Sequence, residues 1–322
     1  MNSDPSDALL SRTPSSACGP LVRAFNASAW AQQLAGNPVT DKVTDHTYDL
    51  MYGVMLMPLL HALGGLPAAS GTPEMANRPL KLLEIGLGCN MQAHRRYSPG
   101  ASAMLWRSLL KGRGELWEAE VDEGCVAQSR KRGLLDGIHT LTGDQADRPT
   151  LRRWVRESGG QFDVVIDDGG HTNRQILTSF EELWPHVRRG GFYFLEDLHI
   201  GRHPSGRSDE PEKAARLGHA QGTPVVADVI QAWIEQLLVH VTSPRHRIVG
   251  SAAAYTDWYH EQAHSRGKYN QSSFVDARRR ARKHPLPPGV AYITCQAQAC
   301  VIAKGCGADP AGRDRERDDA PV

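Results

Sequence analysis

The 322-residue sequence lacks an excess of charge of either sign. Its 37 Lys and Arg stand against 36 Asp and Glu, which leaves a formal net charge of +1. That balance removes the general electrostatic attraction to nucleic acid or to an anionic membrane. With 40% hydrophobic and 23% charged residues, the composition is that of a globular chain and excludes a wholly disordered or fibrous protein. We therefore expect neither a nucleic-acid nor a membrane partner.

The sequence also lacks targeting and membrane-spanning patterns. Its first residues are acidic and contain no basic stretch followed by an apolar run, so they do not read as a secretory signal. Residues 50–73 carry no formal charge, yet they contain Pro58 and Gly64 and have no flanking Lys or Arg anchors. A buried helix followed by a turn explains this stretch better than a membrane span, and we expect a cytoplasmic protein.

The cysteines are few and widely spaced. They form no CxxC pair and no His/Cys spacing typical of zinc sites. We therefore expect free thiols in a reducing compartment. The six cysteines are Cys18, Cys89, Cys125, Cys295, Cys300 and Cys306.

Composition divides the chain into four parts. Residues 1–20 and 306–322 are rich in polar and charged residues and are expected to be disordered. Residues 21–78 are predicted to form a helical extension, whose helix at 48–63 is apolar nearly all round. We expect that helix to pack on the domain, with a homo-oligomer interface as the other interpretation. Residues 79–305 form the main domain.

Within that domain, short apolar runs alternate with helical patterns, which is typical of an α/β fold. Two runs at 290–295 and 299–303 predict an antiparallel hairpin beside the parallel strands. The sequence thus predicts a Rossmann-like, doubly wound, mostly parallel sheet closed by that hairpin, with helices on both faces. Residues 200–288 break the rhythm and are predicted to be an insertion over the active-site end. The parallel strands are expected at 80–86, 115–120, 138–142, 162–167 and 192–196. Helices are expected at 101–110, 126–132 and 148–159, and from 172 and 223 onward.

Three consecutive strand ends carry residues suited to a nucleotide-type cofactor. The segment 84–88, Glu-Ile-Gly-Leu-Gly, ends the first strand, and its glycines allow a tight turn and close approach of the backbone to a ligand. A carboxylate at the end of the second strand can accept hydrogen bonds from both ribose hydroxyls, and Asp144 after the third strand could face an adenine edge. Three such ends in succession favour a cofactor site over ordinary turns. The predicted cofactor-binding residues are Glu84, Gly86, Gly88, Ser102, Glu120, Asp144, Gln145 and Asp167.

Three carboxylates follow the fourth and fifth strands. Asp168 comes directly after 162–167, and Glu196 and Asp197 end the next strand. Because neighbouring parallel strands end at one edge of a sheet, these groups should meet, and without a cation they would repel until one is protonated. Oxygen ligands favour Mg²⁺ or another hard divalent cation. The alternative is that Asp168 caps the following helix and Glu196 pairs with an arginine.

His171 lies three residues past Asp168. A histidine can accept a proton near neutral pH, so one beside a metal and a cofactor is suited to be a general base. A lone histidine is more often a satisfied surface group, and the neighbouring acids are what favour catalysis here. His199 and His139 are less persuasive, although His199 is close enough to Asp197 to support it.

The basic run at 278–283, Arg-Arg-Arg-Ala-Arg-Lys, permits two interpretations. It is either a nucleic-acid patch or localisation signal, or a solvated helix face. The near-zero net charge favours the solvated face.

Together these motifs resemble class I S-adenosylmethionine-dependent methyltransferases. More narrowly, the chain resembles the macrocin/mycinamicin sugar O-methyltransferases and their cephalosporin-hydroxylase relatives. The resemblance spans about residues 80–304. It is carried by the glycine loop, by 100–106 (Gly-Ala-Ser-Ala-Met-Leu-Trp), by 167–171 (Asp-Asp-Gly-Gly-His) and by 196–197 (Glu-Asp). Asn90 stands where the usual loop has a third glycine, and 200–288 has no usable match to the group.

The resemblance implies a seven-stranded sheet, S-adenosyl-L-methionine as cofactor and methyl transfer to a hydroxyl of a small molecule such as a sugar or polyketide. It also implies roles for the site residues. Asp168, Glu196 and Asp197 would hold magnesium, and His171 would be the base. Gly86, Glu120 and Asp144 would contact the cofactor.

Two other functions stay open. One is an iron-dependent hydroxylase on the same fold, which would need a site of two histidines and one carboxylate such as His171, His199 and an Asp. The strand ends offer more carboxylate than imidazole, so methyl transfer is the better prediction. The other is a non-catalytic cofactor-binding or RNA-associated protein, for which only the basic run at 278–283 argues.

Overall fold

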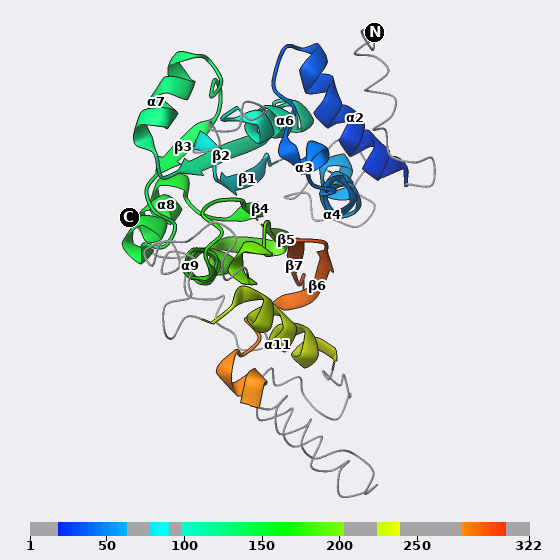
Figure 1. Cartoon of the computed structure of the whole chain (residues 1–322), viewed down its shortest axis with the longest axis vertical. Coiled ribbons are helices and arrows are strands. Elements are labelled where there is room, and N and C mark those ends of the chain that lie inside the picture. The colour runs from blue at the N-terminus through cyan, green and yellow to red at the C-terminus, as the bar shows by residue number, and fades with distance from the viewer. Residues whose placement is uncertain (1–18, 63–77, 90–97, 203–223, 239–278, 307–322) are drawn as a thin grey trace, which may run out of the picture.

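The protein is built around one seven-stranded sheet, in a computed structural model that describes residues 19–62, 78–89, 98–202, 224–238 and 279–306. The strand order is β3-β2-β1-β4-β5-β7-β6 (Figure 1). β1 to β5 pair in parallel, and β7 runs antiparallel to both of its neighbours. The predicted fold class is therefore confirmed, including the closing hairpin. The strands are β1 (Leu80–Ile85), β2 (Gly114–Glu120), β3 (His139–Thr142), β4 (Phe162–Asp167), β5 (Val187–Leu195), β6 (Val290–Gln296) and β7 (Ala299–Lys304).

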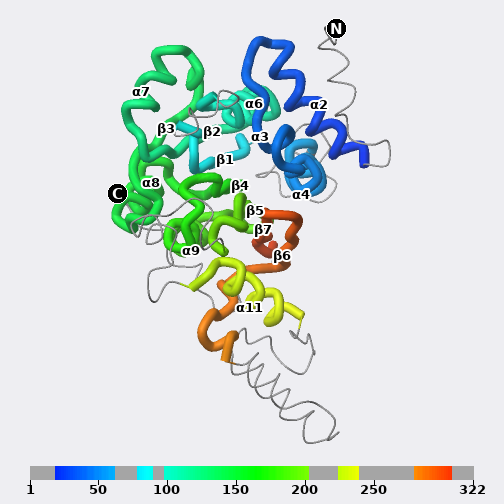
Figure 2. The backbone as a smooth tube through the Cα atoms, viewed as in Figure 1, coloured from blue at the N-terminus to red at the C-terminus, as the bar shows by residue number. Residues whose placement is uncertain are grey.

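Helices cover both faces of this sheet, as the tube in Figure 2 shows. The N-terminal helices, α6 and α7 lie on one side, and α8, α9 and α11 lie on the other. The helices are α2 (Pro20–Leu34), α3 (Asp41–Thr44), α4 (Asp49–Ala62), α6 (Ala101–Leu110), α7 (Glu123–Lys131), α8 (Arg148–Ser158), α9 (Asn173–Leu183) and α11 (Val226–Leu238). Two short 3₁₀ turns are η2 (Trp184–His186) and η3 (Ile200–Arg202).

The hydrophobic core forms two layers because successive side chains of a strand point to opposite faces. In β1, Leu82 packs in the layer of the N-terminal helices and α6, while Leu83 packs in the layer of α8, α9 and α11. Both side chains are buried. Strands that are apolar on both faces belong in the middle of a sheet, which explains why the central strands read as continuous apolar runs.

The helix caps confirm the predicted starts of α8 and α9. Asp147 accepts a hydrogen bond from the backbone N–H of Thr150 at 3.0 Å, and Gly159 ends α8 with a left-handed φ of 75°. Thr172 and Gln175 form a reciprocal capping box at the start of α9. Since His171 directly precedes this box, the cap orients the loop that carries the predicted base.

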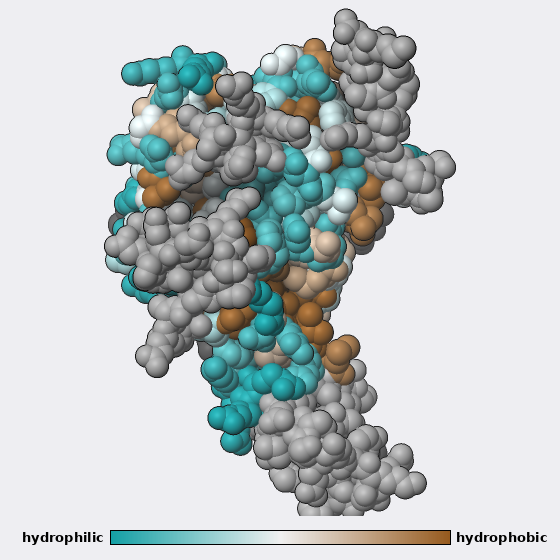
Figure 3. All heavy atoms as spheres, in the orientation of Figure 1, coloured by the Kyte–Doolittle hydropathy of each residue, from teal (hydrophilic) through white to brown (hydrophobic). Residues whose placement is uncertain are grey.

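The N-terminal helices pack on the sheet through aromatic side chains. The Tyr52 ring of α4 lies 4.8 Å from Phe194 of β5 and 5.1 Å from Trp106 of α6, and it also stacks on Phe25 of α2 at 5.3 Å. The predicted packing of this apolar helix on the domain is confirmed. Leu50 and Val54 are half-exposed, and apolar side chains also gather beside α11 and β6 on the face seen in Figure 3. The homo-oligomer interface stays a prediction.

Two disulfides contradict the prediction of free thiols. Cys89, in the loop after β1, bonds to Cys125 of α7, and Cys295 bonds to Cys300 across the β6–β7 hairpin. Sequence spacing gave no warning of the first pair because its partners are 36 residues apart and meet only in the folded sheet. Among the described residues, Cys306 is free and exposed. The inference of a reducing compartment rested on free thiols and loses its support.

Other boundaries differ from the predictions by a few residues. β5 begins at Val187 instead of 192, so Gly190 and Gly191 lie within the strand instead of before it. A Cβ on Gly191 would lie 2.6 Å from the carbonyl oxygen of Asp163, which explains the glycine there. α7 begins at 123 because Asp122 caps it, and α11 begins at 226.

Several predictions fall outside the described residues. These are the disordered start at 1–18, the tail at 307–322, and 203–223 and 239–278 of the insertion. Among the helices that are described, none has the length and apolarity needed to cross a membrane.

Candidate active site

The loops after β1 and β4 meet at the carboxyl edge of the sheet. The backbone N–H of Gly86 donates to Ala119 at 2.8 Å, and that of Asp168 donates to Ile85 at 3.0 Å. Gly86 has a φ of +106°, and a Cβ on it would lie 2.0 Å from the carbonyl oxygen of Asp168. Only glycine fits this position, so the predicted glycine loop directly adjoins the predicted acidic loop.

Glu120 joins the ends of β1 and β2. Its Oε2 accepts a hydrogen bond from the Leu87 N–H at 3.1 Å, and its Oε1 accepts from the N–H groups of Val121 and Asp122 at 2.8 and 3.1 Å. A carboxylate has about four acceptor positions, so Oε2 keeps one for a ligand hydroxyl. Asp144 is exposed after β3 and accepts from the Ala146 N–H at 2.8 Å. The three predicted strand-end groups therefore do line one edge.

Two predicted cofactor residues are instead buried against each other. The Ser102 hydroxyl donates to Glu84 Oε2 at 2.7 Å, and Glu84 is wholly buried. Burial raises the pKa of Glu84. Beside Glu84 in the sheet lies Glu118 of β2, a buried carboxyl that meets no donor among the described residues. Burial, then the adjacent Glu84, raises the pKa of Glu118 well above its ordinary value.

Asp167 and Gln145 form a buried network below the acidic loop. Gln145 donates to Asp167 Oδ1 at 2.8 Å and accepts from the Gly170 N–H at 2.9 Å. Ser179 of α9 and Tyr193 of β5 both donate to Asp167 Oδ2. These polar atoms are engaged within the protein, so the geometry gives both residues a part in shaping the loop from 168 to 171.

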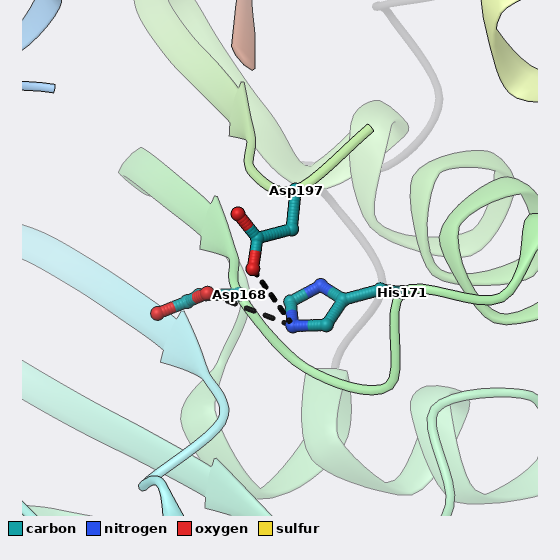
Figure 4. A group of neighbouring side chains, drawn as sticks. All are labelled: Asp168, His171 and Asp197. Carbon is teal, nitrogen blue, oxygen red and sulfur yellow. Dashed lines mark ion pairs between the residues drawn. The ribbon is translucent and has the colours of Figure 1, made fainter. Parts of the chain in front are cut away.

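Asp168, His171 and Asp197 converge above that network (Figure 4). His171 Nε2 lies 3.6 Å from Asp197 Oδ2 and 3.9 Å from Asp168 Oδ1, and one ligand atom from each residue lies within 4.8 Å of the others. His171 and Asp197 both adopt left-handed φ values, 57° and 52°. Such values cost non-glycine residues about 1 kcal/mol or more each. The fold therefore holds both side chains in strained positions that bring them together.

Asp197 is surrounded by groups that keep it ionised. The Tyr48 hydroxyl donates to its Oδ1 at 2.7 Å, and His46 Nε2 lies 3.6 Å from the same oxygen. Burial alone would raise the pKa of Asp197, but His171, the Tyr48 hydrogen bond and His46 outweigh burial and lower it. Asp197 is thus an anion at neutral pH.

A buried lysine occupies the inner side of this group. Lys42 of α3 is 0% exposed, and its Nζ lies 2.7 Å from Asp168 Oδ2, 2.8 Å from Glu196 Oε2 and 3.4 Å from Glu84 Oε1. Burial opposes its charge, but the three carboxylates outweigh burial and raise the pKa of Lys42 well above its usual value. The premise that these acids are unpaired without a metal is therefore wrong.

Glu196 faces this lysine and not the Asp168–His171–Asp197 group. Its Oε2 accepts from Lys42, and its Oε1 accepts from the Tyr52 hydroxyl. Burial and, after it, the nearby Asp168 raise the pKa of Glu196, although Lys42 acts in the opposite direction. One lysine therefore does not fully compensate the carboxylates around it. Asp168 and Asp197 fit a divalent ion, since each directs an oxygen toward the same point. Glu196 as placed here does not, and its metal role stays a prediction.

Sequence patterns did not predict four residues of the site, all of which lie on the N-terminal helices or in the loop between them. They carry no local motif, because a lone lysine or tyrosine in a helical extension gives no sign of a partner more than a hundred residues away. Of the two less persuasive histidines, His199 acts on the site, since it is among the groups that lower the pKa of Asp197. His199 is exposed, and His139 begins β3 at the opposite end of the strand from the site. The four missed residues are Lys42, His46, Tyr48 and Tyr52.

The basic run at 278–283 lies away from this site. Its described residues, 279–283, are helical, and Arg280 forms an ion pair with Glu235 of α11 at 2.9 Å.

Part of the chain matches a known protein family. Residues 97–198 match the family described as a methyltransferase domain. They include β2, β3, β4, β5 and the group formed by Asp168, His171 and Asp197. About a third of the chain therefore resembles a methyltransferase domain, and this part lies within the predicted fold.

The relatives of known activity are sugar O-methyltransferases, which confirms the predicted resemblance. Mycinamicin VI 2''-O-methyltransferase of Micromonospora griseorubida is 37% identical over 142 residues, which is 43% of this chain and 33% of the relative. A tetracenomycin-C 3'-O-methyltransferase of Streptomyces olivaceus, which acts on an 8-demethyl-8-(2-methoxy-α-L-rhamnosyl) form, is 40% identical over 126 residues. That match covers 39% of this chain and 29% of the relative. The chain thus matches about a third of the length of these relatives.

A solved structure is also similar. MycE methyltransferase from the mycinamycin pathway, in complex with Mg, S-adenosylhomocysteine and mycinamycin VI, is 20% identical with a TM-score of 0.49. The match covers 94% of this chain and 64% of that one.

Proposed function

We propose that the protein is an S-adenosylmethionine-dependent O-methyltransferase that acts on a hydroxyl of a small molecule, such as a sugar on a polyketide. One observation carries the proposal. The glycine loop, the Glu120 carboxylate and the Asp168–His171–Asp197 group share one edge of the sheet. Ligands of open α/β sheets bind at this edge. The methyltransferase relatives support the choice of reaction.

Different residues at this edge of the sheet would bind different parts of the cofactor. The loop at Gly86–Gly88 lets the backbone approach the cofactor, and Glu120 has an acceptor position for the ribose hydroxyls. Asp144 is exposed beyond β3, where it can meet the adenine end. When bound, S-adenosylmethionine supplies an electrophilic methyl group. Gln145 and Asp167 hold the loop at 168–171, which carries Asp168 and His171.

The acceptor hydroxyl needs to lose its proton as it attacks the methyl carbon. His171 Nε2 faces the gap between Asp168 and Asp197, where it can take that proton. The new oxygen–carbon bond forms as the carbon–sulfur bond breaks, and S-adenosylhomocysteine leaves. A divalent ion held by Asp168 and Asp197 would supply charge that makes the hydroxyl more acidic. The two carboxylates also keep the acceptor in line with the methyl group.

The hydroxylase alternative finds less support in the geometry. Within the described part of the chain, one group of three ligand residues comes together, and it contains one histidine and two carboxylates. His199 does not belong to this group, so the described residues do not form a two-histidine iron site. The small-molecule acceptor, the cytoplasmic location and the lack of a nucleic-acid partner stay predictions.

The base is tested by replacing His171 with alanine. We expect turnover with methyl-labelled S-adenosylmethionine and a panel of glycosylated acceptors to fall about 100-fold or more, since proton transfer contributes about that much. Affinity for S-adenosylhomocysteine should stay within about twofold because His171 does not touch the glycine loop. The matched control is His139→Ala, a histidine at the far end of β3, which should leave turnover unchanged. Full turnover in His171→Ala would remove His171 from the mechanism.

A further inference from the structure

The cluster inside the site already contains a cation. Lys42 is wholly buried, and its Nζ lies within 2.8 Å of both Asp168 and Glu196 and 3.4 Å from Glu84. A buried cation with this many carboxylate contacts is held in one position, because moving it would leave acids unpaired in a low dielectric. α3 therefore places a fixed positive charge where the sequence alone suggested a metal.

The contacts of Glu196, Asp168 and Asp197 show which of their oxygens remain free to bind a metal. Both oxygens of Glu196 are used, one by Lys42 and one by the Tyr52 hydroxyl. The two oxygens of Asp168 have different partners: Oδ2 accepts a hydrogen bond from Lys42, and Oδ1 faces His171. Asp197 directs its Oδ2 toward His171 as well. A divalent ion can therefore reach the outer oxygens of Asp168 and Asp197, and it reaches Glu196 only if Lys42 leaves.

We propose that Lys42 is the resident cation of this cluster, that it withholds Glu196 from a divalent metal and that it thereby weakens metal binding at the site. The inference rests on the metal site of the proposed function. It makes the N-terminal helical segment a determinant of metal affinity, because α3 carries the competing charge. A positive charge a few ångströms from a divalent ion repels it strongly in a buried site.

The test measures Mn²⁺ binding directly, without cofactor or acceptor. Mn²⁺ shares the oxygen-ligand preference of Mg²⁺ and reports its bound fraction by electron paramagnetic resonance. Lys42→Met keeps most of the side-chain volume and removes the charge, so we expect it to bind Mn²⁺ about tenfold more tightly than the wild type, or better. The matched control is Lys81→Met. Lys81 is 12% exposed in β1 and pairs with Glu115 at 3.3 Å away from the site, so its loss should not change Mn²⁺ affinity.

The outcomes separate this inference from the proposed function. Equal or weaker Mn²⁺ binding by Lys42→Met, with binding retained in the wild type, would overturn the role of Lys42 and leave the metal site standing. No binding by either protein would refute both the metal site and this inference, while S-adenosylhomocysteine binding would still test methyl transfer. If Lys42→Met does not fold in EDTA, Mn²⁺ should restore its fold by replacing the missing charge. Failure of Mn²⁺ to do so would also overturn the inference.

Discussion

Gly86 packs against the backbone of Asp168 where the glycine loop meets the acidic loop, and its replacement by alanine tests whether that contact positions the site. A Cβ there would lie 2.0 Å from the carbonyl oxygen and 2.7 Å from the carbonyl carbon of Asp168, and 3.1 Å from Gly169 Cα. All three atoms are backbone, so no side chain can rotate out of the way. Gly88 provides the comparison, since its φ is also positive, at +79°, but its Cβ would lie 4.0 Å from the nearest atom, Pro99 Cα.

The two substitutions share the strain of a positive φ and differ only in the overlap. The strain costs about 1–2 kcal/mol, which is the whole effect expected for Gly88→Ala. Overlap with fixed atoms adds about 1–3 kcal/mol, so Gly86→Ala should lose about 2–5 kcal/mol of the free energy of unfolding. Urea unfolding of the three proteins followed by circular dichroism measures this difference. Equal losses for the two variants would refute the close approach of the β1 and β4 loops.

Two further substitutions test the buried charges. Glu118 is buried with no donor among the described residues, and its pKa is raised well above the ordinary 4.5. The folded state therefore binds the proton of Glu118 more tightly than the unfolded state does. The stability that Glu118 contributes falls as pH rises above about 4.5. Glu118→Gln should therefore raise the free energy of unfolding at pH 8 by about 1 kcal/mol or more and leave it nearly unchanged at pH 4. A gain that is equal at both pH values would contradict the raised pKa of Glu118. Arg78 donates to both oxygens of buried Asp163 at 2.7 and 2.5 Å, so thermal unfolding of Arg78→Met should show a loss of about 2 kcal/mol or more. Arg152, which is exposed and pairs with Glu182 at 2.9 Å, is the control, because the loss of an exposed charge in Arg152→Met should cost clearly less stability than Arg78→Met. Similar losses in the two variants would show that burial of Asp163 does not matter.

The fold could be predicted from sequence because its signals are local. Each central strand is a short apolar run, and α8 and α9 are bounded by capping residues such as Asp147 and Thr172. The predicted start of β5 was wrong because Gly190 and Gly191 suggested a turn before the strand. In the structure both glycines lie within β5, and Gly191 packs against the backbone of β4.

The site could be predicted only as far as strand order brings residues together. Parallel strands end at one edge, and this rule predicted that Asp168, Glu196 and Asp197 meet. In the structure, Asp168 and Asp197 converge with His171, while Glu196 turns to Lys42. The rule could not find Lys42, whose two nearest partners lie 126 and 154 residues away and whose helix carries no motif. The same limit applies to the bond between Cys89 and Cys125.

Cofactor binding is the property on which the whole proposal depends, because methyl transfer requires S-adenosylmethionine at the edge formed by the glycine loop and Glu120. Calorimetric titration with S-adenosylmethionine and S-adenosylhomocysteine, each with Mg²⁺ and again with EDTA, measures it without a known acceptor. We expect both ligands to bind in the micromolar range in both conditions, since neither Gly86 nor Glu120 belongs to the metal group. Binding of neither ligand in either condition would contradict the methyltransferase function.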